Sequence, residues 1–441
     1  MSSLSEHMTF GKLLRFVLPM IFMLIFMSIY YMVDGFFVSN YVGKTPFAGL
    51  NVIFPALMMF SSLGFMFSSG GSALVSKELG QKKEDEARAS FTTIILACLA
   101  CSIVLSILGF LLTPWISAFL GAEGDLLDYS ILYGRLLFPA LPFFVLQNTL
   151  QGFLMTAGRG SLGLRFILVS GMANILLDAL FVAELQWGLP GAAYATIISQ
   201  VLGALFPVIY FLRPQGKILY FTKPLPSPAP VFQSMYNGLS SLLTYLSDPL
   251  VTMLYTYELL RWAGEDGLAA YSVISYISFL FDAVYIGYSD ALIPVTAYQY
   301  GARKKKELTH ILHSSLKLLP ATGFLLFITA SLSAPWLAEI FVGYDPELTK
   351  LTTHAFRLYS FAYILSGFSK YGDAFFTALN NGTVSALISF THTLVFEVAS
   401  ILLLPVILGT DGLWLSLTAA EIGSALVVFA FLKGMQKEYG Y

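Results

Sequence analysis

Residues 12–38 read KLLRFVLPMIFMLIFMSIYYMVDGFFV, and this stretch indicates the kind of fold to expect. A helix of about 20 apolar residues crosses the hydrocarbon core of a bilayer, so the stretch is long and apolar enough to do so. Residues 1–15 contain no short apolar core that ends at a small-residue cleavage site, as a removed signal peptide would. We therefore interpret residues 12–38 as a membrane span that the protein retains.

Further stretches of similar length and composition follow along the chain. Hydrophobic residues make up 57% of the 441 residues and charged residues only 11%, against roughly 25% charged residues in an average soluble domain. The composition predicts an all-α membrane protein of twelve transmembrane helices without a water-soluble domain. The predicted spans are residues 12–38, 47–76, 89–113, 129–156, 162–184, 190–212, 232–260, 268–299, 310–333, 350–379, 383–408 and 411–432.

The two halves of the chain contain corresponding residues at a constant offset. Gly80 corresponds to Gly301, and Pro114-Trp115 corresponds to Pro335-Trp336. Each copy contains an even number of predicted spans, so the chain returns to its starting side and both copies have the same orientation. We therefore predict two pseudo-symmetric six-helix bundles, related by an axis along the membrane normal, with a substrate path between them.

The predicted domains follow from this duplication. Residues 1–212 form an N-terminal lobe and residues 232–441 a C-terminal lobe, each with six spans. Residues 213–231 between them contain five prolines, which are incompatible with a helix interior. We interpret them as a semi-extended cytoplasmic strap that tolerates rocking of the lobes, with an ordinary surface loop as the alternative.

Basic residues predict how the chain is oriented in the membrane. They concentrate in the loops on the side of the N-terminus, whereas the predicted loops at 114–128, 185–189 and 409–411 contain no Lys or Arg. The positive-inside rule then places both termini in the cytoplasm. The basic loop residues are Lys77, Lys82, Lys83, Arg88, Arg159, Arg165 and residues 303–306.

Two function classes are disfavoured by composition. A net charge of −2, without a continuous basic face, gives no attraction to nucleic acid. Cys98 and Cys101 have the spacing of a redox or metal motif, but no other Cys or nearby His completes such a site, so we expect them to pack in the third span. We predict no cofactor and no metal apart from a coupling ion.

The first span contains a buried acid and a proline. A carboxylate near the bilayer centre costs on the order of 3 kcal/mol, so Asp34 needs a functional or structural reason. Pro19, fifteen residues earlier, removes a hydrogen bond from the helix and predicts a bend there.

A second polar cluster lies in the fifth and sixth spans. Asn174 and Asp178 are four residues apart and share one helix face, and Thr196 follows in the sixth span. With Asp34 they supply oxygen atoms that suit a small hard cation such as Na⁺, while the buried carboxyl groups equally suit a proton. The sequence leaves this choice open. For Asn174 or Thr196 alone, an ordinary hydrogen bond between helices is the alternative.

The second half of the chain does not repeat this cluster. Tyr255 occupies the position that corresponds to Asp34, and Lys370 and Asp373 are spaced so that they could neutralise each other. The eighth span is rich in aromatic residues, which with nearby acids suit a flat lipophilic cation, although lipid or packing contacts are the alternative. The candidate substrate-cavity residues are Tyr255, Asp248, Asp282, Tyr285, Asp290, Asp373 and Glu397, and Glu421 is a further buried acid.

Three stretches together resemble the MATE family of multidrug and toxic compound extrusion transporters, most closely its bacterial multidrug type. They are VDGFFV at 33–38 followed by Val42-Gly43, GGSALVSKELG at 70–80 followed by Ala87, and NILLD at 174–178 with GAAYAT at 191–196. The resemblance covers essentially the whole chain.

This resemblance implies two six-helix bundles that open alternately to each side and export organic cations or drugs in exchange for H⁺ or Na⁺. It implies an ion or proton site at Asp34, Asn174, Asp178 and Thr196, and a bend of the first helix at Pro19. Some relatives use acids in the seventh and tenth spans, which leaves a second ion site open. The resemblance to the bacterial type also implies the bacterial inner membrane, and we expect a monomer surrounded by lipid.

Three alternatives remain at this stage. A flippase of lipid-linked sugars would need a basic cavity for pyrophosphate, whereas the excess here is acidic. An intramembrane enzyme is disfavoured because Lys370 replaces the first glycine of a GxGD motif ending at Asp373, and HExxH and GxSxG motifs are absent from the sequence. A receptor or scaffold that transports nothing would leave the buried acids unexplained.

Overall fold

A computed structural model describes residues 3–214 and 216–441, and these residues form helices and connecting turns without any strand. The α-helices are α1 Phe10–Phe37, α2 Lys44–Gly80, α3 Glu84–Phe119, α4 Gly124–Leu137, α5 Leu141–Thr156, α6 Gly160–Asp178, α7 Leu189–Leu212, α8 Ala229–Asn237, α9 Leu239–Gly301, α10 Lys305–Val342, α11 Pro346–Tyr359, α12 Ser366–Ala378, α13 Gly382–Phe390, α14 Val398–Leu408 and α15 Thr410–Tyr439. Short 3₁₀ segments occupy Ser3–Ser5, Phe138–Ala140 and Ser360–Ile364, and π-helical segments occupy Val38–Val42, Ala179–Glu184 and Thr391–Glu397.

These elements group into the twelve predicted transmembrane helices. The 3₁₀ segments join α4 to α5 and α11 to α12, and a π-helical segment joins α13 to α14, so each pair forms one span. Within α9, Gly264 has φ 64° and ψ −158°, which breaks the helix into the seventh and eighth spans. A conformation of this kind is tolerated by glycine because it lacks a Cβ atom.

Several helices extend beyond the predicted spans. The predicted span 310–333 lies inside α10, Lys305–Val342, and the span 89–113 lies inside α3, Glu84–Phe119. Hydropathy detects only the apolar part of a helix. The polar ends of these helices, such as the acidic first turn of α3, remain helical outside the apolar part.

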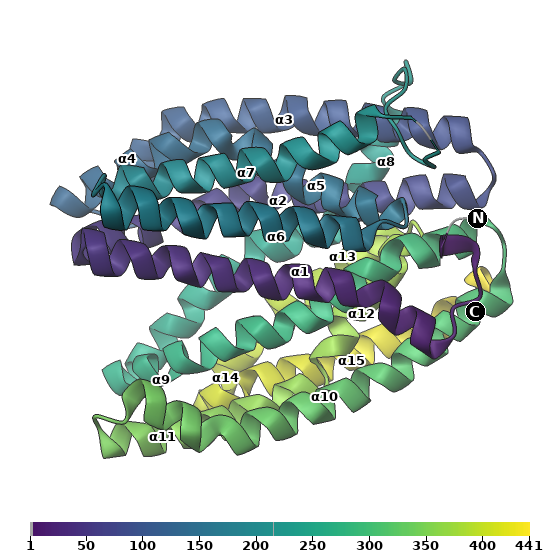
Figure 1. The fold of residues 1–441 in the computed structure, drawn as a ribbon. Helices are drawn as coiled ribbons and strands as arrows, with labels where there is room; N and C mark the ends of the chain where they lie inside the picture. The colour runs from purple at the N-terminus through teal and green to yellow at the C-terminus, as the bar shows by residue number, and fades with distance from the viewer. Residues whose placement is uncertain (1–2, 215) are drawn as a thin grey trace.

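The helices form two groups (Figure 1). The first bundle consists of α1–α7, drawn in purple to teal, and the second bundle consists of α9–α15, drawn mainly in green and yellow. Both termini lie at the same end of the molecule. The two bundles approach each other at that end and diverge toward the opposite one.

Glycines permit the close approach at the end that carries the termini. A Cβ atom on Gly80 would clash with the backbone of Tyr298, and one on Gly301 would clash with the backbone of Lys77. The corresponding glycines of the two halves thus bring the ends of α2 and α9 together. Nearby, Ser69 and Ser241 face each other with their hydroxyl oxygens 2.8 Å apart. Small residues at helix crossings let backbones pack closely in this way.

The strap between the bundles is held against the first one. The backbone N–H groups of Thr222 and Leu225 donate to the hydroxyls of Thr92 and Thr93 on α3, over 3.0 and 2.8 Å. Arg88 donates to the carbonyl of Ile218 over 2.9 Å. The prediction that all of 213–231 is non-helical was wrong at its end, because α8 begins at Ala229. Pro230 lies in its first turn, where a proline needs no partner for its nitrogen.

Candidate functional site

Asp34 and Asp178 each lie at a point where an α-helix changes to a π-helical segment. Asp34 lies in the last turn of α1, before Val38–Val42, and Asp178 is the last residue of α6, before Ala179–Glu184. Both side chains are buried. Such π-helical turns are rare in proteins, and those that occur are often found at functional sites. Here they follow two helices, α1 and α6, that pack side by side.

The polar atoms of this cluster lack hydrogen-bond partners. Within the described part of the chain, none is found for Oδ1 of Asp34, for either oxygen of Asp178 or for either amide atom of Asn174. The two carboxyl groups are close enough to interact electrostatically. Buried polar groups are almost always hydrogen-bonded, so a convergent set without partners is suited to hold an ion, a proton or ordered water.

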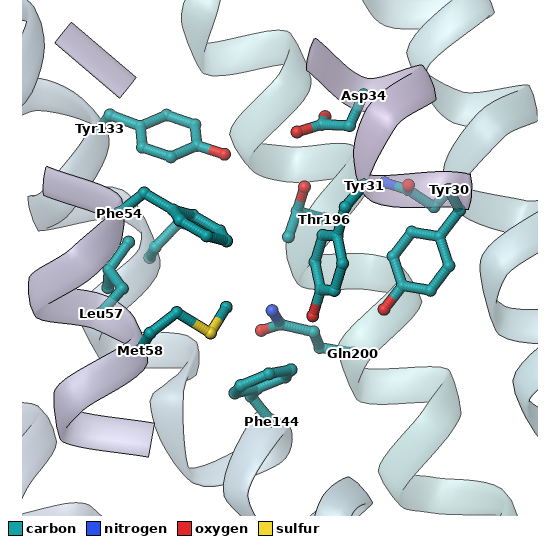
Figure 2. Close-up of a pocket in the computed structure, with 12 residues that line it drawn as sticks. Tyr30, Tyr31, Asp34, Phe54, Leu57, Met58, Tyr133, Phe144, Thr196 and Gln200 are labelled. Carbon is teal, nitrogen blue, oxygen red and sulfur yellow. The ribbon is translucent and has the colours of Figure 1, made fainter. Parts of the chain in front are cut away.

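A pocket next to this cluster combines polar and aromatic groups (Figure 2). Asp34, Asn174 and Thr196 line it, whereas Asp178 lies outside the lining. Figure 2 shows Asp34 and Tyr133 near one end of the pocket and Phe144 near the other. The rest of the lining is mainly aromatic and apolar and consists of Tyr30, Tyr31, Phe54, Leu57, Met58, Leu137 and Gln200.

Sequence reasoning missed four polar residues of this pocket, Tyr30, Tyr31, Tyr133 and Gln200. Tyr31 lies three residues before Asp34, and Gln200 lies four residues after Thr196, so helical periodicity alone places each beside a predicted residue. Tyr133, on α4, is close enough to Asp34 and Asp178 to interact with them electrostatically. No local pattern connects Tyr133 to those acids, because only the packing of α4 brings it there.

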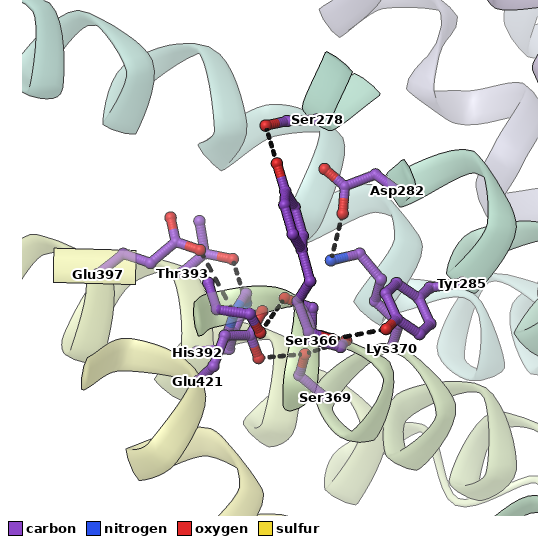
Figure 3. A network of polar contacts seen from close by, with 12 residues as sticks. Ser278, Asp282, Tyr285, Ser366, Ser369, Lys370, His392, Thr393, Glu397 and Glu421 are labelled. Carbon is purple, nitrogen blue, oxygen red and sulfur yellow. Dashed lines mark hydrogen bonds and ion pairs between the residues drawn. The ribbon is translucent and has the colours of Figure 1, made fainter. Parts of the chain in front are cut away.

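In the second bundle, the predicted neutralisation of Asp373 by Lys370 was wrong. The Lys370 ammonium lies 3.1 Å from a carboxylate oxygen of Asp282, on the neighbouring helix α9 (Figure 3). Asp373 instead accepts hydrogen bonds from Ser389 over 3.1 Å and from Thr377 over 3.4 Å. The packing of α12 against α9 therefore pairs Lys370 with Asp282 rather than with Asp373 on its own helix.

A histidine that sequence reasoning missed connects two of the acids. Nε2 of His392 lies 3.3 Å from Oε1 of Glu397 and 3.3 Å from Oε1 of Glu421. Ser369 donates to the other oxygen of Glu421 over 2.9 Å. Figure 3 shows this group beside the pair of Asp282 and Lys370.

The other predicted cavity residues lie apart from the pocket of the first bundle. The hydroxyl of Tyr255 donates to the carbonyl of Leu413 over 2.9 Å, and that of Tyr285 donates to the carbonyl of Tyr363 over 2.6 Å. Both phenols are therefore engaged in packing within the second bundle. Asp248 is exposed on α9, and Asp290 is partly buried on the same helix. Pro19 lies inside α1, which continues through it.

Comparison with known proteins finds relatives along the whole chain. The family model MatE matches residues 19–180 and 240–402. The multidrug export protein MepA of Staphylococcus haemolyticus (strain JCSC1435) is 22% identical over 428 residues, which cover 96% of this chain and 93% of that protein. MepA of Staphylococcus aureus (strain bovine RF122 / ET3-1) is 20% identical over 421 residues, covering 95% and 92%.

Solved structures with a similar fold include MATE in complex with MaL6, with a TM-score of 0.92, and the outward-facing conformation of a multidrug resistance MATE family transporter of the MOP superfamily, with a TM-score of 0.91. Each is 22% identical to this chain, and the alignment covers 97% of this chain and 96% of the other. The MatE model matches once in each half and covers most of the chain. The chain therefore belongs to the MatE family, whose members are membrane transporters rather than enzymes.

Proposed function

We propose that this transporter exports lipophilic organic cations or drugs from the cell in exchange for H⁺ or Na⁺. The observation that carries the proposal is the pocket in which a buried acid, Asp34, meets aromatic side chains. The curated relatives that cover most of the chain are named multidrug export proteins, which supports the same class of substrate.

The ion half of the proposal rests on Asp34, Asn174, Asp178 and Thr196. Two carboxylates buried close together repel each other strongly in a medium of low polarity, so one cation bound between them relieves that cost. A proton would be shared by the carboxyl groups. A sodium ion would use the oxygen atoms of the same four residues, which are ligands that hard cations prefer.

The substrate half rests on the aromatic lining. A flat organic cation is stabilised by contact with the faces of aromatic rings. In the pocket, the ring centroids of Tyr31 and Phe54 lie 6.1 Å apart, with the rings edge to face. Because Asp34 belongs to both the pocket and the ion cluster, an organic cation and the coupling ion would compete for one carboxylate. Such competition supports exchange if the two ligands stabilise different states of the transporter.

We further propose that the lobes 1–212 and 232–441 rock against each other as a monomer in the inner membrane. With both termini in the cytoplasm, as the basic loops predict, the closed end of this structure faces the cytoplasm and the bundles diverge toward the outside. Bending of α1 at Pro19 would move Asp34 relative to α6 and so link ion occupancy to the direction of opening.

The test is efflux of a fluorescent lipophilic cation from proteoliposomes under a proton gradient or a sodium gradient alone. Wild type is compared with Asp34→Asn, and Asp125→Asn serves as a control because Asp125 is exposed in the first turn of α4. Efflux that follows one gradient and is lost only in Asp34→Asn supports the proposal and names the ion. Normal exchange by Asp34→Asn would contradict the assigned site. Failure of any cation to move in wild type would direct attention to lipid-linked or endogenous metabolites.

A further inference from the structure

The cluster of His392, Glu397 and Glu421 has no counterpart in the ion site proposed above. It lies in the second bundle, where a π-helical segment carries His392 and Glu397 and α15 carries Glu421. The side chain of Glu421 is 1% exposed, and those of His392 and Glu397 are 14% and 16% exposed. The neighbouring pair is more open, with 23% of Lys370 and 38% of Asp282 exposed. The buried Glu421 therefore lies beside polar side chains that are partly exposed.

The geometry around the imidazole is unusual because two carboxylates face the same nitrogen atom. Nε2 can carry only one hydrogen, so it can donate fully to only one of the two oxygens that lie 3.3 Å away. Among the residues that the structure describes, neither Nε2 of His392 nor Oε1 of Glu421 has a well-oriented hydrogen bond. The side chains of His392, Glu397 and Glu421 therefore lie close together, but their hydrogen-bonding capacity is not fully used.

The π-helical segment creates this convergence. His392 and Glu397 are five residues apart, which in a regular α-helix places them about 140° apart around the axis. A π-helical turn closes its hydrogen bonds between residues five apart and so aligns the two side chains. This arrangement requires a rare backbone conformation, which is costlier than a plain α-helix and is typical of functional sites.

The balance of charge identifies the ligand. Lys370 is paired with Asp282 and also interacts electrostatically with Glu397 and Glu421, while His392 is the basic group that lies directly between these two acids. The buried carboxylate of Glu421 and the partly buried one of Glu397 are unfavourable beside a neutral imidazole, and one bound proton reduces their joint charge. A sodium ion fits less well, because its preferred ligands are oxygen atoms and a nitrogen lies at the centre.

Apart from Lys370, the described residues of the surrounding elements supply no cation to balance these acids. The titratable groups that face the cluster are Lys370 on α12 and Asp248, Tyr271, Asp282 and Tyr285 on α9. The flanking helices α13 and α14 contain no titratable residue in their sequences. The proton on His392 is therefore the one positive charge whose presence can change at this point.

We propose that His392, Glu397 and Glu421 form a proton-binding site in the second bundle, separate from the acids of the first, which the protein loads and unloads during transport. The transport part of this inference rests on the proposed function, and the proton-binding part does not. Loss of the proton would replace attraction between the π-helical segment and α15 by repulsion, so occupancy would bias how these two elements pack.

The first experiment measures proton binding directly. The chain contains five histidines, and NMR of histidine labelled with ¹³C at the ε1 carbon distinguishes neutral from charged imidazole, with the His392 signal assigned by its loss in His392→Gln. We expect His392 to titrate and to bind its proton about tenfold more weakly in Glu421→Gln and in Glu397→Gln, because an opposite charge within a few ångströms is removed. The matched control is His354→Gln, since His354 is an exposed histidine that pairs with Asp411 over 2.8 Å.

Two outcomes would overturn proton binding: His392 neutral from pH 5 to pH 10.5, or charged throughout with identical behaviour in both glutamate variants. Because Glu421 is buried and its replacement carries a risk to folding, Glu397→Gln provides the second, more exposed variant. The transport part is tested by the pH dependence of efflux. It fails if His392→Gln keeps the wild-type pH profile while Asp34→Asn abolishes efflux, and that pattern leaves the proposed function standing.

Discussion

At the scale of single residues, the acids of the first bundle have an uncharged polar side chain, that of Tyr133, within electrostatic range. Tyr133 is almost completely buried and interacts electrostatically with both Asp34 and Asp178. Its hydroxyl is therefore placed to influence the occupancy of the acid pair, whether the ion is H⁺ or Na⁺. A phenylalanine at this position would keep the ring and remove only the polar atom.

We expect Tyr133→Phe to shift the ion concentration for half-maximal efflux at least threefold while the protein remains folded, because the buried hydroxyl interacts electrostatically with both acids in a medium of low polarity. Tyr194→Phe removes a hydroxyl from an exposed tyrosine on α7 and serves as the control. The measurement is efflux against ion concentration in proteoliposomes. Equal curves for Tyr133→Phe and wild type would show that the hydroxyl plays no part in ion binding.

Asp178 offers a second prediction at this scale, because it belongs to the ion cluster but does not line the pocket. We expect Asp178→Asn to lose coupled efflux, as Asp34→Asn does, while still binding the organic cation within about threefold of wild type. Asp34→Asn, which removes a carboxylate from the pocket wall, should bind the cation more weakly. Binding is measured by fluorescence titration in detergent, and equal affinity losses in both variants would contradict the separation of roles. The threefold limit corresponds to about 0.6 kcal/mol.

At the scale of helices, sequence predicted the spans well because hydropathy is a local property that each helix carries alone. The same reasoning missed the π-helical segments, since it assumes a period of 3.6 residues and therefore separates His392 from Glu397. It also paired Lys370 with its neighbour along the helix, whereas packing brought Asp282 from another helix. Pairings between residues on different helices could therefore not be predicted from this sequence alone.

The crossing of α2 and α9 gives a prediction at the same scale. Gly80→Ala or Gly301→Ala would place a methyl group against backbone atoms, which cannot rotate away as a side chain can. Overpacking of this kind typically costs about 1–3 kcal/mol, so we expect the closed end to be disfavoured and efflux to slow at least tenfold. Gly434→Ala on α15 is the control, because nothing lies within 4 Å of its added Cβ atom. Unchanged efflux in both Gly80→Ala and Gly301→Ala would show that close packing of α2 against α9 is not needed for transport.

At the scale of the whole molecule, alternating opening requires the end with the termini to separate. Ser69 and Ser241 face each other across that end, so Ser69→Cys and Ser241→Cys together, with Cys98 and Cys101 replaced by serine, should form a disulfide under oxidation. We expect oxidation to stop efflux and a reductant to restore it, while each single variant stays active. Continued efflux by the oxidised double variant would contradict the rocking of the bundles.

The attachment of the strap limits how the bundles can move. Hydrogen bonds hold the strap to α3 as far as Leu225, and α8 packs against α2 and α3. The chain therefore stays in contact with the first bundle up to the end of α8, just before Gly238. The next helix, α9, begins one residue later, at Leu239. Because the tether is this short, the start of α9 stays close to α2 as long as α8 keeps its place, so separation of Ser69 from Ser241 requires α8 to leave α2 and α3 together with the second bundle.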